Sequence, residues 1–217
     1  MLRKYDHIIW DWNGTLVDDV DLCVTILNKI LPEYDLPLTS RRQYVEDFSH
    51  PVKDYYCGLG FDFCKCSFDD IAVFFNAEYK LLRAFCNLQD NSEYALNQLS
   101  KYGYQQSILS AYQQHRLEES VDIYNIRKFF VKIAGLGDHY ASSKIERGKE
   151  LLRDLKADPA KTLMIGDTVH DFEVVQSIGS DCVLVGNGHN KKERLENCNV
   201  PVYDSIKEIV TVLLSEN

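Results

Sequence analysis

Two stretches of the sequence place aspartates directly after short apolar runs. Asp11 follows His7–Trp10 in HIIWDWNGT, and Asp167 comes two residues after Thr162–Ile165 in TLMIGDTVHD. Two carboxylates at neighbouring strand ends repel each other unless a positive charge lies between them. A divalent cation supplies that charge, and Mg²⁺ favours a few carboxylate oxygens together with water and phosphate oxygens. The pattern therefore predicts a Mg²⁺ site between Asp11 and Asp167.

A serine and a lysine occupy comparable positions in the chain. Ser110 directly follows the segment QSIL, and Lys144 stands at the start of the helical pattern KIERGKELL, which also contains Lys149. A helix would aim the two lysines about 140° apart, so one of them can face a common pocket, and we favour Lys144 because it lies nearer the strand ends. Beside a metal, a serine and a lysine imply a doubly charged anion, and phosphate fits.

The elements that must position these residues alternate between short apolar strands and amphipathic helices. This alternation predicts an α/β fold in which a Rossmann-like core has a parallel five-stranded sheet covered on both faces. Ligands bind such sheets at the carboxyl ends of the strands. The expected strands are His7–Trp10, Gln106–Leu109, Phe129–Ile133, Thr162–Ile165 and Cys182–Val185. The expected helices cover about Asn91–Lys101, Ile145–Leu155, Phe172–Ile178 and Ser205–Leu214.

One region interrupts the alternation directly after the first strand. Segments such as DVDLCVTILNKIL and FDDIAVFFNAEYKLLRAF have helical periodicity and no strand-like run between them. We therefore expect a helical domain over residues 17–86, inserted into a core formed by residues 1–16 and 87–217. The insert is expected to leave and rejoin the core through short connections near Val17 and Phe85.

The bulk composition excludes several classes of function. The chain has 217 residues and a net charge of −9, which disfavours nucleic acid and anionic membrane surfaces as partners. No run of about 18 apolar residues and no leader-like apolar stretch are present. The seven cysteines lack paired spacing, which favours reduced thiols, and we expect a cytoplasmic protein.

Read together, these pieces resemble the motifs of the haloacid dehalogenase superfamily, and within it the phosphoglycolate-phosphatase-like phosphohydrolases. Members carry an Asp-x-Asp-x-Thr loop, a serine or threonine ending the second core strand, a lysine before a helix, and a Gly-Asp-x-x-x-Asp loop. The corresponding pieces here are residues 11–15 (DWNGT), Ser110, Lys144 and residues 166–171 (GDTVHD). The resemblance spans nearly the whole chain in the right order, and the helical insert then corresponds to a cap domain.

The resemblance implies a nucleophile and a metal site. Asp11 would attack phosphorus and form an aspartyl-phosphate, which water then hydrolyses. Asp167, together with Asp11 and the backbone carbonyl of Asn13, would hold Mg²⁺, the implied cofactor. Asp171 would be a further ligand or would support the ligands, and it is also a candidate N-cap of the helix that follows, two roles that can coexist.

The resemblance also implies how phosphate is bound. Ser110 and Lys144 would hold the transferring phosphoryl oxygens, and Gly14 and Thr15 of the first loop are expected to join them. Electrostatic stabilisation of this kind does most of the work in phosphoryl transfer. The implied activity is hydrolysis of a phosphomonoester, with a small phosphorylated metabolite as the substrate.

Asn13 is where the sequence departs from the phosphatase pattern. The second acid of the first loop normally protonates the leaving oxygen, and an amide cannot exchange a proton usefully near neutral pH. Losing a general acid typically lowers the rate by about 10²–10⁴. The enzyme then acts on esters with good leaving groups, recruits another acid (Asp18, Asp19 or His170), or turns over slowly. We expect Mg²⁺-dependent activity to survive at a modest rate.

Three other functions are compatible with the same residues. A dehalogenase would attack carbon with Asp11 and use no metal, which leaves the acidic pair Asp167 and Asp171 without a purpose. A binding module for a phosphorylated ligand or a protein would not need a nucleophile. A phosphonate-cleaving enzyme would need a Schiff-base lysine in the cap, for which the sequence offers Lys29, Lys53, Lys65 and Lys80.

Histidine and aromatic residues complete the prediction. His170 and His189 lie near predicted loops and are expected at the surface more than in acid–base roles. The insert is rich in aromatic side chains, which are expected to form its own small core more than to stack on a substrate. These are Tyr55, Tyr56, Phe61, Phe63, Phe74 and Phe75.

Overall fold

The computed structural model describes residues 4–137 and 143–215, and its centre is a parallel sheet of six strands in the order β5-β4-β1-β6-β7-β8. Every neighbouring pair in this sheet is parallel. The strands are β1 His7–Trp10, β4 Gln105–Gln113, β5 Lys132–Leu136, β6 Thr162–Gly166, β7 Asp181–Val185 and β8 Val202–Tyr203.

The sheet differs from the expected one in two respects. It has six strands where the sequence predicts five, because β8 is only two residues long and too short to leave a pattern. The expected strand Phe129–Ile133 was placed too early. Arg127–Phe129 forms a 3-10 turn from which Phe129 packs against the core, and the strand begins only at Lys132.

Helices cover both faces of the sheet, because side chains along each strand alternate between two clusters. Ile8 and Trp10 of β1 pack with three helices on one face, and Ile9 packs with two helices on the other. All four residues of β1 are buried, as in a central parallel strand. The core helices are α5 Ser92–Lys101, α6 Gln114–Ile123, α7 Lys144–Leu155, α8 Val169–Ile178, α9 Lys192–Glu196 and α10 Ile206–Ser215.

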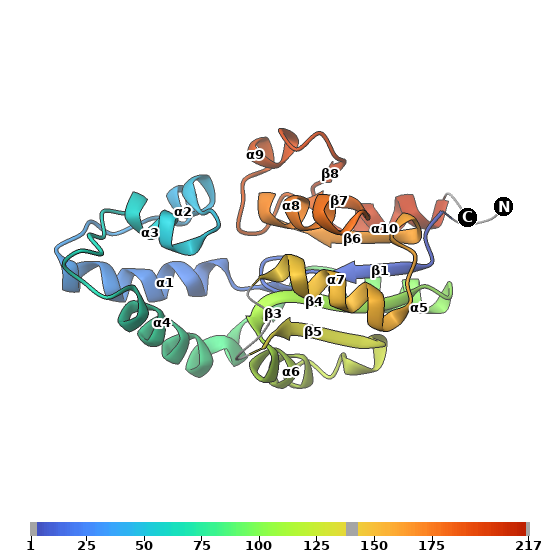
Figure 1. Ribbon diagram of the computed structural model, residues 1–217, viewed down its shortest axis with the longest axis horizontal. Coiled ribbons are helices and arrows are strands. Elements are labelled where there is room, and N and C mark those ends of the chain that lie inside the picture. The colour runs from blue at the N-terminus through green and yellow to red at the C-terminus, as the bar shows by residue number, and fades with distance from the viewer. Residues whose placement is uncertain (1–3, 138–142, 216–217) are drawn as a thin grey trace.

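A second group of helices follows β1 and lies beyond one end of the sheet (Figure 1). These helices share a separate apolar cluster. They are α1 Val20–Ile30, α2 Arg41–Asp47, α3 Val52–Gly58 and α4 Phe68–Leu82. Together they form the cap inserted after the first core strand.

The two chain connections between the core and the cap pair with each other. Strand β2, Val17–Asp18, runs antiparallel to β3, Asn87–Leu88. Short 3-10 turns complete the architecture at Leu31–Tyr34, Arg83–Phe85, Arg127–Phe129 and Pro159–Lys161. Across the described residues, no helix combines the length and the apolar character that crossing a membrane requires.

Candidate active site

The register of the central strands gathers the predicted residues at one edge of the sheet. Trp10 pairs with Ile108 on one side and with Ile165 on the other. The pairing continues one residue further, where the amide of Asp11 donates to the carbonyl of Ile165 at 2.9 Å. Asp11 and Asp167 directly follow β1 and β6, and the carboxyl ends of parallel strands meet at one rim. Ser110 lies at the same level but inside β4, which continues to Gln113, beyond the end expected at Leu109.

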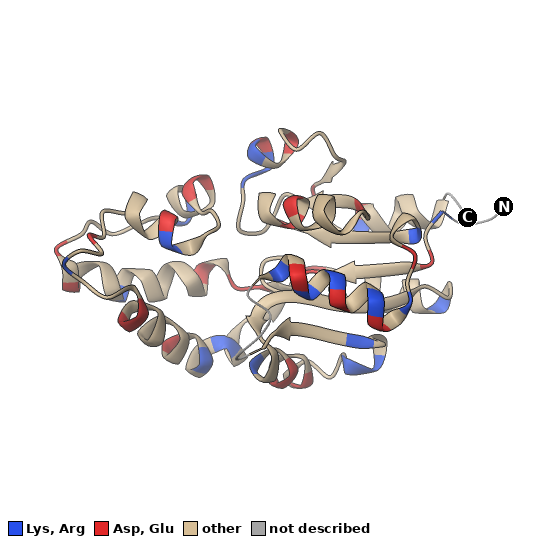
Figure 2. Ribbon diagram, viewed as in Figure 1, with Lys and Arg blue, Asp and Glu red and all other residues tan. Residues whose placement is uncertain are grey.

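Lys144 reaches this rim from the first position of α7. Its ammonium group donates to Asp11 Oδ1 and, at 2.6 Å, to Asp171 Oδ1, and its side chain is buried. Lys149 instead pairs with Glu146 on the exposed face of α7, a helix that carries both acidic and basic segments along its length (Figure 2). The structure therefore brings Lys144, and not Lys149, to the carboxylates.

Asp171 is held by the start of α8. Thr168, and not Asp171, is the N-cap residue, and the two form a reciprocal capping box. Asp171 Oδ2 accepts hydrogen bonds from the amides of Asp167 and Thr168 and from the Thr168 hydroxyl, at 3.2, 3.0 and 2.7 Å. Its other oxygen is left to face Lys144, so one aspartate orders the helix start and the site together.

Asp11, Asp167, Asp171 and Lys144, hereafter the rim cluster, carry more negative than positive charge. Oxygens of the three carboxylates lie within 4.8 Å of one another, and among the described residues Lys144 is the cation that forms ion pairs with them. Burial raises the pKa of Asp11 well above its usual value, reinforced by the charges of Asp171 and Asp167 against that of Lys144. Burial likewise raises the pKa of Asp167 to about 6.

The donor set of the rim cluster fits a divalent cation. Three ionised carboxylates and one ammonium leave a surplus of two negative charges in a buried place, which is costly without a counter-charge. Carboxylate oxygens are the ligands that Mg²⁺ prefers. A magnesium ion therefore suits both the charge and the ligand chemistry of this cluster.

Gly14 sits where a side chain would collide with the site. Its φ is +75°, a region that favours glycine, and an added Cβ would lie 2.3 Å from Asp167 Oδ2 and 2.4 Å from His189 Cδ2. Its amide donates to Asp19 Oδ1 at 2.9 Å and to the Val17 carbonyl at 2.9 Å. The geometry thus makes Gly14 a close-packing position whose amide is already engaged.

Two residues predicted to bind phosphate have different positions. Ser110 is buried and lines the cavity described below, and its hydroxyl oxygen accepts from the amide of Tyr112 at 3.1 Å. Thr15 is fully buried away from that cavity, and its hydroxyl donates to Asp167 Oδ1 at 2.6 Å. Thr15 and Gly14 thus contact Asp167 and Asp19, and these hydrogen bonds help to orient the site.

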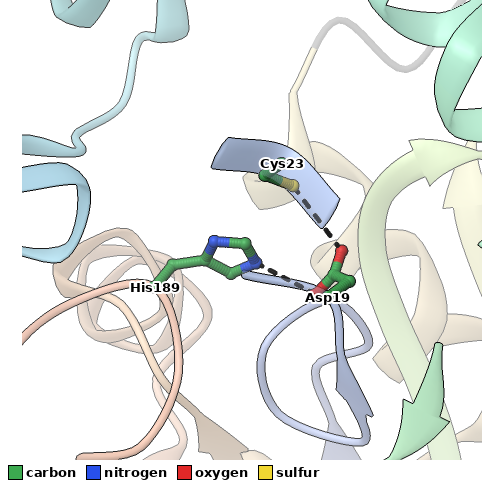
Figure 3. Close-up of side chains that lie close together, drawn as sticks. All are labelled: Asp19, Cys23 and His189. Atoms are coloured by element: carbon green, nitrogen blue, oxygen red, sulfur yellow. Dashed lines mark hydrogen bonds and ion pairs between the residues drawn. The ribbon is translucent and has the colours of Figure 1, made fainter. Parts of the chain in front are cut away.

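Asn13 belongs to a second buried group of polar side chains. Its amide nitrogen donates to Asp19 Oδ2 and to the Tyr79 hydroxyl, both at 2.7 Å, and Tyr79 donates in turn to Asp19 at 2.8 Å. His189 Nε2 lies 3.2 Å from Asp19 Oδ1, and Cys23 lies beside the same carboxylate (Figure 3). Asn13, Asp19, Tyr79 and His189 are hereafter the Asp19 network.

The Asp19 network is neutralised internally. Burial would raise the pKa of Asp19, but the charge of His189 and the hydrogen bonds from its neighbours outweigh burial and hold that pKa below its usual value. Burial would likewise lower the pKa of His189, but the Asp19 charge prevails and raises it to about 9. Asp19 is therefore an ionised anchor near neutral pH, which argues against its serving as a replacement acid.

His189 is the main residue for which the sequence predicted the wrong place. It was expected at the surface, but it is 5% exposed, and its amide donates to Asp167 Oδ2 at 2.6 Å while its ring contacts the Tyr44 hydroxyl at 2.9 Å. The signal was present in GNGHN, a glycine-rich turn that follows the carboxyl end of β7 and so lies on the same rim.

A cavity of about 330 Å³ opens above both groups, between the core and the cap. Its polar floor includes Asp11, Asn13, Ser110 and Lys144, and His170 also lines it. The cap contributes an aromatic wall from α2, α3, α4 and the loop after α2. The aromatic members of that wall are Tyr44, Phe48, Tyr55, Tyr56, Phe68, Phe75 and Tyr79.

Comparison with known proteins agrees with this architecture. The chain is similar to the pyrophosphatase PpaX of Bacillus velezensis, at 22% identity over 180 residues that cover 82% of each protein. A predicted phosphatase from Clostridium acetobutylicum shares the fold with a TM-score of 0.82 and 19% identity, over 97% of this chain and 99% of the other. The structure of protein tyrosine kinase A (PtkA) from Mycobacterium tuberculosis shares the fold with a TM-score of 0.81 and 21% identity, over 97% of this chain and 98% of the other.

The family assignment comes from a sequence model. The model for haloacid dehalogenase-like hydrolases matches residues 8–185, which run from β1 to the end of β7 and include the cap. This match confirms the resemblance that the motifs predicted. The chain is therefore a member of the haloacid dehalogenase-like hydrolases.

Proposed function

We propose that the protein is a Mg²⁺-dependent phosphatase that hydrolyses a small phosphorylated metabolite through an aspartyl-phosphate on Asp11. The observation that carries the proposal is the rim cluster, in which Asp11 and Lys144 line the cavity floor and Asp167 and Asp171 lie directly beside them. The names of the relatives, a pyrophosphatase and a predicted phosphatase, support the same class of reaction.

In the proposed reaction Asp11 is both the nucleophile and a metal ligand, and the residues around it bind the phosphoryl group or the metal. An Asp11 carboxylate oxygen attacks phosphorus and the bond to the leaving oxygen breaks; water then attacks the phosphorus of the aspartyl-phosphate and frees Asp11. Lys144 and Ser110 neutralise and orient the phosphoryl oxygens. Asp11, Asp167, Asp171 and the Asn13 carbonyl would hold Mg²⁺, which supplies charge neutralisation for the transferring group when bound.

Phosphate release tests this proposal directly. With 4-nitrophenyl phosphate and Mg²⁺, we expect turnover by the wild type and a loss of at least about 10³-fold in Asp11→Asn, because the amide is not a nucleophile. Asp122→Asn is the matched control, since this aspartate pairs with Arg127 at the surface and does not belong to the rim cluster. No turnover in the wild type, or equal turnover in Asp11→Asn, contradicts the proposal.

Two alternative enzyme classes receive less support from the site. A metal-free dehalogenase has no use for Asp167 and Asp171 beside the nucleophile. A phosphonate-cleaving enzyme needs a cap lysine at the substrate, but among the described residues that line the cavity Lys144 of the core is the one lysine. Borohydride trapping with an aldehyde substrate would detect such a Schiff base, and we expect none.

A non-hydrolytic role is the remaining candidate, and the likeness to PtkA, named a tyrosine-protein kinase, is the observation that favours it. In that case Asn13 would mark a site that binds a phosphorylated ligand or protein without hydrolysing it. Calorimetry with Mg²⁺ and inorganic phosphate, showing tight binding in a protein without turnover, would favour this role.

The seven free cysteines support our placing the protein in the cytoplasm.

A further inference from the structure

The preferred leaving group of the substrate can be read from the juxtaposition of Asn13 with the aromatic wall. We propose that the substrates are monoesters of phenols, that is, small aryl phosphates whose leaving oxygen departs as a phenolate without being protonated by the enzyme. This inference rests on the proposed phosphatase function and specifies its substrate class.

The orientation of Asn13 fixes what position 13 can offer a substrate. The nitrogen of the Asn13 side-chain amide donates one N–H to the Asp19 carboxylate and the other to the Tyr79 hydroxyl, both at 2.7 Å. The group left on the Asn13 side chain is its carbonyl oxygen, Oδ1, which can only accept a hydrogen bond. The position that normally gives a proton to the leaving oxygen therefore has no proton to give.

The hydroxyl and imidazole groups that contact Asp19 are occupied as well. Tyr79 donates its proton to Asp19, and His189 is bonded at both ring nitrogens, to Asp19 and to Tyr44. His170 lines the cavity and pairs through Nδ1 with Glu173 at 3.1 Å. Among the described core residues that line the cavity, it is the one histidine outside the Asp19 network. An experiment must therefore exclude His170 as the acid that protonates the leaving oxygen.

The wall shows what the leaving group consists of. Among the described cap residues that line the cavity, Asp19 is the one carboxylate and His50 the one histidine, and none is a lysine or an arginine. Phe75 from α4 stacks beside Tyr79, and Tyr79 meets Tyr112 of the core edge to face. A volume of about 330 Å³ lies at the small end of the range for ligand sites, which suits a phosphate and one ring.

The chemistry of phenols links these two observations. A phenol has a pKa near 10, as in tyrosine, whereas the hydroxyl of water has a pKa of about 15.7 and simple alcohols resemble water. When Asp11 attacks phosphorus, the P–O bond to the ring oxygen breaks and its electron pair leaves on the phenolate, which takes a proton from solvent. The same step with an alkyl ester would expel a far more basic alkoxide, which needs an acid.

Three substrates separate the ring from the leaving group. Phenyl phosphate has both a ring and a good leaving group, 2-phenylethyl phosphate has a ring on a poor leaving group, and acetyl phosphate has a good leaving group without a ring. With Mg²⁺ we expect kcat/KM for phenyl phosphate to exceed that for 2-phenylethyl phosphate by about 10²–10⁴, the usual worth of a general acid. Asn13→Asp should raise turnover of the phenylethyl ester and narrow the ratio.

Neighbouring phenylalanines on α4 provide a matched pair for the wall. Phe75 lines the cavity, whereas Phe74 is 44% exposed on the same helix. Phe75→Ala should lower kcat/KM for phenyl phosphate about tenfold relative to acetyl phosphate, which corresponds to the ~1.4 kcal/mol expected of an aromatic contact. Phe74→Ala should leave this ratio unchanged. Benzylphosphonate has no P–O–C bond to cleave, so calorimetry can measure its binding alone. We expect Phe75→Ala to weaken this binding and Phe74→Ala to leave it unchanged.

The outcomes distinguish this inference from the function on which it rests. Equal kcat/KM for phenyl and 2-phenylethyl phosphate overturns the inference and leaves the phosphatase standing, and a ratio that rises in His170→Gln would then identify His170 as the acid. The inference is also overturned if Phe75→Ala leaves the ratio of kcat/KM for phenyl phosphate to kcat/KM for acetyl phosphate unchanged. Failure to release phosphate from all three compounds, acetyl phosphate included, overturns the phosphatase proposal itself.

Discussion

The rim cluster and the Asp19 network each contribute side chains to one cavity, and they solve the problem of buried charge in opposite ways. The rim cluster holds three carboxylates against one ammonium, and the pKa values of Asp11 and Asp167 are raised. The Asp19 network holds one carboxylate against an imidazolium and several donors, and the pKa of Asp19 is lowered. Gly14 keeps the two groups within contact of each other.

The difference shows why proximity of candidate ligands does not identify a metal site. Asp19, Cys23 and His189 also present ligand atoms within 4.8 Å of one another. However, Asp19 is already neutralised by His189, both of whose ring nitrogens are engaged, and burial raises the pKa of Cys23 well above its usual value. A protonated imidazole and a protonated thiol cannot ligate a metal, whereas the rim cluster carries surplus negative charge, so we expect the cation at the rim cluster.

Removing the central charge of the Asp19 network should produce the largest change in stability. Asp19→Asn leaves His189 buried without its counter-charge, and breaking a buried pair in this way costs about 3–5 kcal/mol. Denaturant unfolding followed by circular dichroism measures this free energy. Asp122→Asn, which breaks an exposed pair with Arg127, should change the free energy of unfolding far less, because surface ion pairs contribute little. Equal small losses in both variants would mean that the network contributes no specific stability.

Added magnesium should separate the two groups next. At about one hundred times its Kd, Mg²⁺ should raise the free energy of unfolding of the wild type by about 2.7 kcal/mol, because it binds the folded state. Asp167→Asn should lose this increase, whereas Asp19→Asn should keep it relative to its own lower baseline. The comparison fails if the increase disappears in Asp19→Asn and persists in Asp167→Asn.

The smallest expected effect concerns two histidines that share burial and differ in partner. Burial lowers the pKa of His50 to about 4, with the charges of His170, Lys144 and His189 acting in the same sense and Asp171 opposing them. His189, paired with Asp19, has a pKa of about 9. Titration of labelled histidines by NMR should resolve these two values, and similar values would refute the view that the partner decides the charge.

The same shift has a consequence for stability with a defined sign. The folded-state pKa of His50 lies below its unfolded value near 6.5, so the unfolded chain takes up the proton first as pH falls. The His50 contribution to the free energy of unfolding should therefore be lost progressively from about pH 6.5 through about pH 4. His50→Gln should remove this part of the dependence, as a set of unfolding curves across that range would show.

The sequence predicted the parts of the fold that have local patterns. The apolar run His7–Trp10, the helical periodicity of the insert and the order of the loops were enough to expect an α/β core with a cap. The two-residue strand Val202–Tyr203 has no periodicity, which is why the predicted sheet is one strand short. The aromatic residues of the cap were expected to form a core, and Tyr55 and Tyr56 do so while also lining the cavity.

What the sequence determined by itself is which residue types follow the buried strands, and that includes the amide at position 13. Chain connectivity and side-chain chemistry are enough for that prediction, because parallel strands bring their carboxyl ends to one rim. The tertiary structure alone decided which partner each group has. Thr15 donates to Asp167, Asp19 is neutralised by a histidine 170 residues away, and Lys144 bridges two aspartates, because charge and hydrogen bonds depend on distances that sequence spacing does not contain.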